Sequence, residues 1–311
     1  MVKVAVAGGS GVLGRSLVDV LANQSKHEGI ILTRKASDVD LGLPSFVVDY
    51  DDVASLTKFL DENKVDTIIS AFGINGTSLS RSQNNLIKAA DASSVTRRFI
   101  PSSFAIKYPE DGPAILPPLQ SYFDSIEMLR NSGLEWAVVH NGTFLDYFFP
   151  PSGIKTYYNH GTLVVDMLNN SAAIPGTGDE VLAFTYTFDV AKFVIAAVDL
   201  ESWPAELRII GTRLTFNELI ELAEKAKGKK FTVTYDNLDK LRRFEISELP
   251  GHEKDYPKFP KEVLLPFLSI FERWMAEGHG DLEYGGSLNE MFPDIETLTA
   301  QELMEVYWKA G

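Results

Sequence analysis

VKVAVAGGSGVLG, residues 2–14, joins a short apolar run to glycines at positions 8, 11 and 14. The apolar run predicts a strand covered on both faces, and the residues Val12–Leu21 predict an amphipathic helix. Gly8 permits a tight turn, Gly11 lets the backbone approach a phosphate, and Gly14 permits close packing of helix against strand. Because N–H groups and the dipole at a helix N-terminus attract anions, we expect this loop to hold the pyrophosphate of a dinucleotide. The alternative is an ordinary strand, turn and helix without a ligand.

The residues that end the second predicted strand, Gly29–Thr33, select between two dinucleotides. A site for NAD has Asp or Glu here, which accepts hydrogen bonds from the ribose 2'-hydroxyl. This chain instead reads Thr33-Arg34-Lys35. The Arg34 guanidinium can bind a 2'-phosphate through two N–H groups and stack on adenine, while Lys35 adds a charge and Thr33 a hydroxyl. The pattern favours NADP(H), and the alternative is that both cations belong to a solvated turn.

Composition excludes several classes of protein. The chain has 311 residues, 45% of them hydrophobic, and a net charge of -14, which argues against a nucleic-acid or anionic-membrane surface. It has no cysteine, and its five histidines never pair at metal-ligand spacing, so we expect neither disulfides nor a metal. The chain begins with a core strand and not with a signal peptide, and no apolar run reaches about 18 residues. We therefore expect a cytoplasmic protein.

Strand-like and helical runs alternate through the first half of the chain. They predict strands at Val2–Ala7, Gly29–Thr33, Ser45–Val48, Thr67–Ala71, Arg98–Pro101 and Glu135–His140, and helices at Val12–Leu21, Val53–Asn63, Leu79–Ala92 and Tyr122–Ser132. This alternation predicts an α/β fold, a Rossmann doubly wound parallel sheet with helices on both faces. The ligand crevice of such a sheet lies beyond the carboxyl ends of its strands.

A second, smaller α+β lobe is expected after Phe144. There the stretch Tyr147–Pro151 is rich in aromatic residues and proline and cannot continue a regular element. We expect residues 1–150 to form the dinucleotide-binding domain, with 183–212 returning to it. Residues 151–182 and 213–311 then form the substrate-binding lobe.

Local signals within the second half are fewer. Thr215 and Glu218 form the pattern of a capping box before a helix over Phe216–Ala226. The proline-rich stretch Leu249–Pro260 predicts a loop. Aromatic residues gather at residues 144–149 and 274–284, where they either wall an apolar pocket between the lobes or belong to the core.

Six stretches of the chain, taken in order, carry a resemblance to a known family. They are the glycine loop, the Thr-Arg-Lys ending of the second strand, Arg98–Phe104, Ser132–Trp136, Phe184–Ala191 and Leu288–Asp294. Together they resemble the isoflavone reductase-like and NmrA-like branch of the atypical short-chain dehydrogenases, in particular its fungal members. The resemblance runs almost end to end. It implies an NADP-binding Rossmann domain and reduction of an aromatic, alkaloid-like or polyketide-like molecule in specialised metabolism.

The resemblance also implies roles for residues that follow the strands. It assigns the pyrophosphate to Gly8, Ser10, Gly11, Val12, Leu13 and Gly14, and the 2'-phosphate to Thr33, Arg34 and Lys35. It places Asp49 and Tyr50 beside the adenine, Ala71, Phe72 and Gly73 under the ribose, and Ser102, Ser103 and Asn141 near the nicotinamide.

The chain departs from this family at the residues of proton transfer. Ordinary short-chain dehydrogenases use a tyrosine and a lysine four residues apart, because the lysine lowers the pKa of the phenol. Here no lysine follows any of the eleven tyrosines at that spacing. Reductases of the isoflavone type carry a lysine on the helix before the strand that ends near Asn141, whereas Ser121–Arg130 contains none.

Three sets of residues are candidates to replace it. Lys107 lies on the loop after Ser103 and supplies a cation, unless it is a solvated surface lysine. Tyr122 and Asp124 serve as acid and base, unless both are helix-surface groups. His140, at a strand end, is the third candidate, unless it is a satisfied core histidine.

We expect an NADP(H)-dependent reductase that acts on a moderately hydrophobic small molecule between the lobes. The first alternative is a cyclase or isomerase that retains NADP structurally, which the missing lysine suggests. The second is an NADP-sensing regulator without turnover, and only this alternative requires a protein partner.

Overall fold

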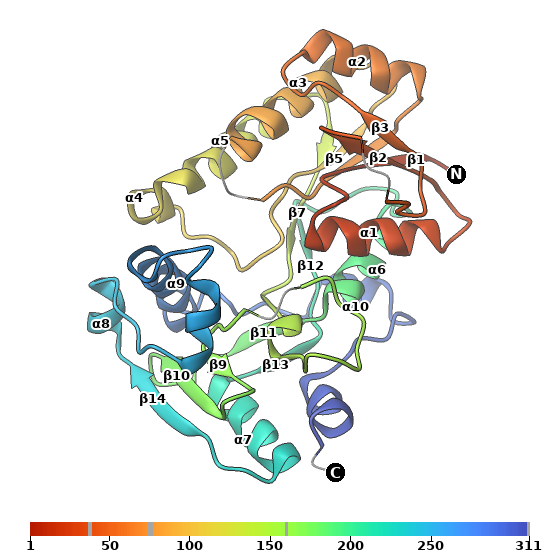
Figure 1. Cartoon of the computed structure of the whole chain (residues 1–311). Coiled ribbons are helices and arrows are strands. Elements are labelled where there is room, and N and C mark those ends of the chain that lie inside the picture. Colours follow the sequence, from red (N-terminus) through yellow and green to blue (C-terminus); the bar gives the residue numbers. More distant parts are fainter. Residues whose placement is uncertain (37–38, 74–76, 159–160, 310–311) are drawn as a thin grey trace.

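A parallel sheet of six strands forms the N-terminal part of the protein (Figure 1). The computed structural model describes residues 1–36, 39–73, 77–158 and 161–309. The strand order is β3-β2-β1-β4-β5-β6. The strands are β1 (Lys3–Ala7), β2 (Glu28–Thr33), β3 (Ser45–Val47), β4 (Thr67–Ser70), β5 (Arg98–Ile100) and β6 (Glu135–Trp136). Because β2 and β4 flank β1, the direction of strand addition reverses there, and ligands of such sheets bind at that point.

Helices cover both faces of this sheet, as the predicted fold class requires. They are α1 (Val12–Ala22), α2 (Val53–Glu62), α3 (Asn84–Ala92), α5 (Gln120–Arg130) and α6 (Thr187–Ala197). The short helix α4 (Gly112–Ile115) lies away from the sheet, where Ile115 packs in the cluster that contains Tyr122 and Trp274 (Figure 1). Val4 and Val6 of β1 belong to the core cluster that contains α1 and α6. Ala5 and Ala7, which point the other way, belong to the cluster that contains α2, α3 and the end of α5. The Rossmann prediction is therefore confirmed.

The strand predicted at Glu135–His140 is divided in the structure. β6 pairs with β5, whereas β7 (Val138–His140) pairs in parallel with β12 (Glu206–Arg208), which comes from a distant segment. Pro101 follows β5 and has no N–H group, so it cannot donate a further hydrogen bond to this ladder. β7 and β12 form a separate two-stranded sheet, and the returning chain lies against the first domain, since α6 packs against α1.

The second half of the chain adds two small sheets, which Figure 1 shows at the other end of the molecule from β1 and β2. One has the order β13-β11-β8 and the other β14-β10-β9. Their strands are β8 (Thr143–Phe144), β9 (Val165–Asp166), β10 (Ser171–Pro175), β11 (Leu182–Thr185), β13 (Thr212–Leu214) and β14 (Thr232–Asp236). The helices here are α7 (Phe216–Lys227), α8 (Leu238–Arg242), α9 (Lys261–Ala276), α10 (Leu288–Met291) and α11 (Ala300–Glu302).

Local predictions for these elements have mixed outcomes. The Thr215 capping box is confirmed, since its hydroxyl accepts from the Glu218 N–H at 3.1 Å. The predicted loop after Leu249 contains a 3-10 helix, and the helix predicted from Leu79 begins with a π-helical turn. The irregular helices are Ser78–Gln83, Pro117–Leu119, Leu145–Phe148, Pro250–Asp255 and Leu303–Tyr307.

The described part of the chain carries neither a membrane-spanning helix nor a cluster of metal-ligating side chains. Within residues 1–36, 39–73, 77–158 and 161–309, no helix is both long and apolar enough to cross a bilayer. Over the same residues, no group of three or more His, Asp and Glu side chains comes together in a way that could hold a metal ion.

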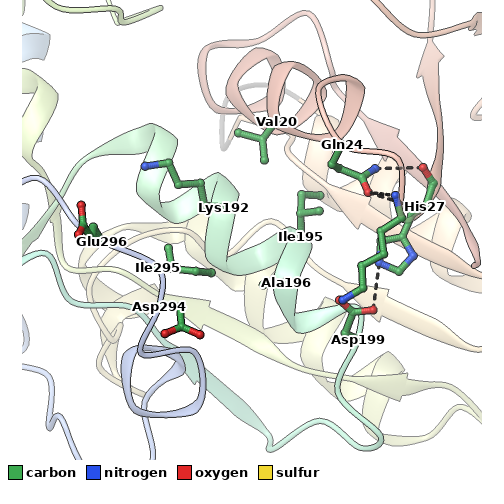
Figure 2. Close-up of a pocket in the computed structure, with 11 residues that line it drawn as sticks. Val20, Gln24, His27, Lys192, Ile195, Ala196, Asp199, Asp294, Ile295 and Glu296 are labelled. Atoms are coloured by element: carbon green, nitrogen blue, oxygen red, sulfur yellow. Dashed lines mark hydrogen bonds and ion pairs between the residues drawn. The ribbon is translucent and has the colours of Figure 1, made fainter.

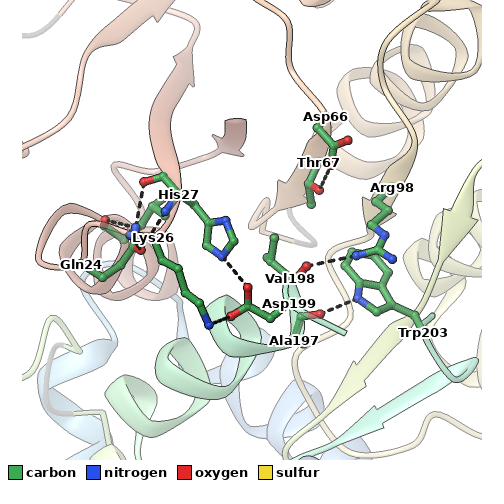
Figure 3. Close-up of polar contacts among 11 residues, drawn as sticks. Gln24, Lys26, His27, Asp66, Thr67, Arg98, Ala197, Val198, Asp199 and Trp203 are labelled. Atoms are coloured by element: carbon green, nitrogen blue, oxygen red, sulfur yellow. Dashed lines mark hydrogen bonds and ion pairs between the residues drawn. The ribbon is translucent and has the colours of Figure 1, made fainter. Parts of the chain in front are cut away.

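Arg98 joins the first sheet to the segment that returns to it. Its Nε donates to Glu135 of β6 at 2.5 Å, and its other nitrogens donate to the carbonyls of Val198 and Glu201 beyond α6. The guanidinium lies 5.0 Å from the centre of the Trp203 ring (Figure 3). Only 16% of the Arg98 side chain is exposed, so these contacts are well shielded from water.

We expect Arg98→Met to lower the free energy of unfolding by about 2–3 kcal/mol, because it leaves a half-buried carboxylate and two carbonyls without their donor. Urea denaturation measures this. The control is Arg130→Met, which removes an exposed pair with Glu127 on α5 and should cost at most about 0.5 kcal/mol. Equal losses in the two variants would contradict the role given to Arg98.

Candidate functional site

The glycine loop after β1 can be built only from small residues. Gly8 has a φ of 84°, and a Cβ there would lie 2.7 Å from the Ala71 carbonyl oxygen. A Cβ on Gly14 would lie 2.1 Å from the Gly8 carbonyl oxygen, which is a severe clash. The Gly11 N–H donates to the same Gly8 oxygen at 3.0 Å and closes the turn. The first turn of α1 is thereby held directly against the end of β1.

The N-terminus of α1 is open toward solvent. Gly11 precedes the helix and has no side chain that could cap it, and Ser10 and Gly11 are exposed. Val12 and Leu13 are half-buried, and no acidic residue occurs in the first turn. The free N–H groups and the positive end of the helix dipole therefore face the space beyond β1, as an anion site requires.

Positive charge lies at the end of the neighbouring strand β2. Arg34 and Lys35 are exposed, and within the described part of the chain neither side chain has a hydrogen-bond or ion-pair partner. The Thr33 hydroxyl donates to the Lys35 carbonyl at 2.9 Å and so shapes this turn. The two cations are thus available to a ligand, whereas the Thr33 hydroxyl already has a partner.

The two residues predicted beside the adenine lie in different environments. Asp49 is exposed and accepts a hydrogen bond from the Asp51 N–H at 2.9 Å. Tyr50 is buried, its hydroxyl donates to the Leu32 carbonyl at 3.2 Å, and burial raises its pKa. Its ring meets Phe72 edge-on at 5.3 Å. Tyr50 is therefore held in place by Leu32 and Phe72, and its role beside the adenine stays a prediction.

Residues after β4 and β5 are joined by hydrogen bonds. Phe72 is half-buried and Gly73 exposed, and the Phe72 carbonyl accepts from the Ser102 hydroxyl at 2.5 Å. The Ser102 N–H donates to Gln83 at 2.8 Å. Ser103 is buried, and its hydroxyl accepts from the Val139 N–H at 2.8 Å. The Ser103 hydroxyl is therefore engaged by the backbone of neighbouring segments, and its place beside the nicotinamide stays a prediction.

Asn141 follows β7 and is fully buried. Its N–H donates to the Ala105 carbonyl, and its own carbonyl accepts from Thr185. The Asn141 side-chain oxygen and the neighbouring Thr143 hydroxyl have no partner among the residues that the structure describes. Unsatisfied buried acceptors mark places where a ligand or a water molecule donates.

A cavity of about 260 Å³ lies between the loops that follow β5 and β7 and the helix α9. Its lining residues are Phe104, Ala105, Ile106, Tyr108, Gly142, Thr143, Phe144, Tyr147, Leu163, Phe267, Leu268, Phe271 and Met275. As far as the structure describes this lining, none of its residues carries a charge. The cavity therefore suits a neutral, apolar and aromatic ligand.

Two groups of aromatic rings form much of this lining. Tyr108 packs edge-on against Tyr122 at 5.3 Å and against Trp274 at 5.9 Å. Tyr147 packs against Tyr158, also at 5.3 Å. Burial raises the pKa of Tyr147 to about 12 and raises that of Tyr108 as well. The phenols that border the cavity are therefore neutral at physiological pH.

The four residues predicted to transfer protons are absent from the lining described above. Lys107 is exposed, and its ammonium lies 2.8 Å from Glu206 at the start of β12. Asp124 is exposed on the outer side of α5, where it accepts from Gln120. Tyr122, two residues earlier, is buried against Tyr108. Because positions two apart lie on different faces of a helix, the structure places the side chains of Tyr122 and Asp124 on opposite sides of α5 and does not bring them together.

His140 lies within β7 and is only 3% exposed. Burial lowers its pKa from the usual 6.5 to about 4. Its Nδ1 is buried and has no partner in the described part of the chain. His140 is therefore a buried, neutral side chain, but the described residues do not satisfy its Nδ1 as a satisfied core histidine would require.

Tyr108, Phe267 and Phe271 were missed as lining residues. Phe267 and Phe271 are four residues apart on α9 and so share one face of that helix. This spacing predicts lining residues only once the position of α9 beside the cavity is known. Of the two aromatic stretches noted in the sequence, residues 144–149 contribute Phe144 and Tyr147 to the cavity. Trp274 of the other stretch lies behind Tyr108 as core.

A larger groove, of about 570 Å³, lies elsewhere, between α1, α6 and the segment Asp294–Glu296 (Figure 2). Its floor is formed by Val20 and Ile195, and the paired His27 and Asp199 stand at one end. Val20 is eight residues along α1 from Val12, a rise of about 12 Å. The groove therefore adjoins the far end of α1 and not the glycine loop.

Comparisons with known proteins cover the whole chain. A family model described as the NmrA-like family matches residues 2–309. Oxidoreductase swnN from Metarhizium robertsii is 30% identical over 337 residues, which cover 99% of this chain and 98% of that protein. Oxidoreductase BOA1 from Botryotinia fuckeliana is 32% identical over 301 residues, covering 95% of this chain and 96% of that one. The solved binary complex of leucoanthocyanidin reductase with NADPH from Vitis vinifera has a TM-score of 0.75 at 19% identity, and covers 98% of this chain and 99% of its own.

The lowered pKa of His140 predicts a dependence of stability on pH. The unfolded chain takes up a proton at this residue below about pH 6.5, whereas the folded protein resists it until about pH 4. The free energy of unfolding therefore falls as the pH drops through this window. We expect His140→Gln to lose about 2 kcal/mol less than the wild type between about pH 7 and pH 5, measured by urea denaturation. His279→Gln, at a half-buried turn after α9, is the control. An unchanged pH dependence in His140→Gln would count against the assignment.

Proposed function

The chain belongs to the NmrA-like family, and we propose that it is an NADPH-dependent reductase of a hydrophobic small molecule. Two relatives similar to it over nearly their whole length are named oxidoreductases. A solved reductase of the same fold binds NADPH. The observation that carries the proposal is the uncapped start of α1 beside two free cations, at the same edge of the sheet as an uncharged aromatic cavity.

The residues at this edge fit NADPH. Gly8, Gly11 and Gly14 form a cradle in which a Cβ would occupy the space between loop and helix, and the N–H groups of Val12 and Leu13 would bind the pyrophosphate. The Arg34 guanidinium would bind the 2'-phosphate. Ser10, Lys35, Asp49, Ala71, Phe72, Gly73 and Ser102 complete the proposed binding surface. Asn141 contributes its unsatisfied side-chain oxygen at the far end.

We propose that two parts of the chain bind different ligands. Residues 1–150 and 183–212 would bind the dinucleotide, which the pairing of β12 with β7 and the packing of α6 on α1 support. Residues 151–182 and 213–311 would contribute the substrate-binding side, since Leu163 and α9 line the cavity.

The chemistry follows from these contacts. Bound NADPH supplies a hydride to an electrophilic carbon of the substrate. The aromatic lining of the cavity excludes water and holds a flat apolar molecule in place. An aromatic, alkaloid-like or polyketide-like compound of specialised metabolism fits this description.

Turnover is tested by incubating purified protein with NADPH and a panel of aromatic and alkaloid-like compounds. Substrate-dependent loss of NADPH absorbance, with reduced product identified by mass spectrometry, supports a reductase. Product formed without oxidation of NADPH would instead identify a cyclase or isomerase. Binding of NADP(H) with no turnover of any compound would favour the regulator, provided that the oxidised and reduced forms bind with different affinity.

Arg34→Ala tests the choice of cofactor. We expect it to weaken NADPH binding about 10- to 100-fold, because a charge-assisted contact to the 2'-phosphate is lost, and to change NADH binding by less than about twofold. Isothermal titration calorimetry measures both. Arg243→Ala, an exposed arginine paired with Glu245, is the control and should change neither. Equal weakening of NADPH and NADH would remove Arg34 from the 2'-phosphate site.

A further inference from the structure

We propose that the Tyr108 hydroxyl binds and protonates the carbonyl oxygen of a neutral, flat ketone of one or two rings in the aromatic cavity. This inference rests on the proposed reductase function and names the substrate class and the proton donor.

The loop after β5 places Tyr108 in the cavity. Ile106 and Tyr108 both line it, whereas Lys107 between them is turned outward to Glu206. The Tyr108 ring is held from behind by the edges of Tyr122 and Trp274. Trp274 is fully buried and Tyr122 nearly so, which keeps the phenol in one position.

The Tyr108 hydroxyl is free to bind a ligand. No hydrogen-bond partner for it occurs among the described residues. The Tyr108 oxygen also differs from the side-chain oxygens of Asn141 and Thr143, which are fully buried and without a partner in the described part of the chain. Its electrostatic neighbours are the phenols of Tyr122 and Tyr147, and burial raises its pKa further above 10. The group therefore remains protonated throughout the working range of pH and acts as a donor.

The reaction balances with this single donor. Hydride delivery from NADPH to the carbonyl carbon moves the π electron pair of the C=O bond onto oxygen. The Tyr108 O–H bond then breaks as its proton passes to that oxygen, and water later returns a proton to the phenolate. Because an alkoxide is a stronger base than a phenolate, the transfer is favourable even from a phenol of raised pKa.

Size and charge of the cavity define the ligand. At about 260 Å³ the cavity lies near the lower end of ligand pockets, which favours one or two rings. A charged ligand would lose its hydration without gaining an ionic partner from the described lining, and so a neutral one is favoured.

The test compares two probes of nearly equal shape, 2-acetylnaphthalene and 2-isopropenylnaphthalene, which differ in C=O against C=CH₂. Calorimetry measures the affinity of each for the full-length protein loaded with NADP⁺. Tyr108→Phe removes only the hydroxyl and keeps the ring, so thermal unfolding should stay close to wild type. We expect it to reduce the preference for the ketone over the alkene about three- to tenfold, while the affinity for the alkene stays unchanged.

Tyr284→Phe, which alters an exposed tyrosine outside the cavity lining, is the control and should keep the wild-type preference. Tyr147→Phe alters the other phenol of the cavity and tests whether that phenol is the donor instead. In the turnover of 2-acetylnaphthalene, Tyr108→Phe should lower kcat about 100-fold or more, and its KM should change far less.

Each of the following outcomes would overturn one part of the proposal. The donor assignment fails if Tyr108→Phe keeps the wild-type preference, or if Tyr147→Phe loses it instead. The substrate class fails if NADP⁺ binds but neither naphthalene does. If the folded protein takes up no NADP⁺, the proposed function itself is refuted, and this inference with it.

Discussion

The close approach of α1 to the end of β1 is the constraint on which the remaining structure depends. A Cβ on Gly14 would lie only 2.1 Å from the Gly8 carbonyl oxygen, because that carbonyl stands against the helix. The same helix packs on α6 and accepts the segment after residue 150, where the Tyr157 hydroxyl donates to Asp19 at 2.7 Å and Arg15 lies over the Tyr157 ring. A shift of α1 would therefore move the anion site, the returning segment and one edge of the second lobe together.

Features that depend on neighbouring residues could be predicted from the sequence. The glycine spacing, the period of the apolar residues and the strand–helix alternation gave the sheet and its order of elements correctly, because each follows from local backbone geometry. The Thr215 capping box was found for the same reason. The position of Arg34 at the end of β2 follows from the sheet, and its lack of a partner in the described part of the chain agrees with the hypothesis of a ligand there.

Features that depend on distant segments could not be predicted. The division of 135–140 into two strands requires β12, which lies 66 residues beyond β7 in sequence and pairs with it only in the fold. The sequence does not show whether Tyr122 or Asp124 faces inward from its helix. Only the packing of Tyr108 against Tyr122 and Trp274 shows which face of α5 is buried. Lys107 was a candidate because of its charge, yet Ile106 and Tyr108 on either side of it line the cavity while Lys107 pairs with Glu206.

The distribution of charge gives a physical reason for the missing family lysine. Lys107, Glu206, Arg208 and His140 interact with one another around β7 and β12, outside the described cavity lining. An ammonium group placed among Phe144, Tyr147 and Phe271 would lose its hydration, and no carboxylate of that lining would compensate for it. A phenol pays little for the same burial and still donates a hydrogen bond, which is stronger where water is excluded. An aromatic, uncharged cavity and a neutral donor are therefore two aspects of one requirement. A chain that lost the lysine but kept other charged side chains in its cavity would not meet this requirement.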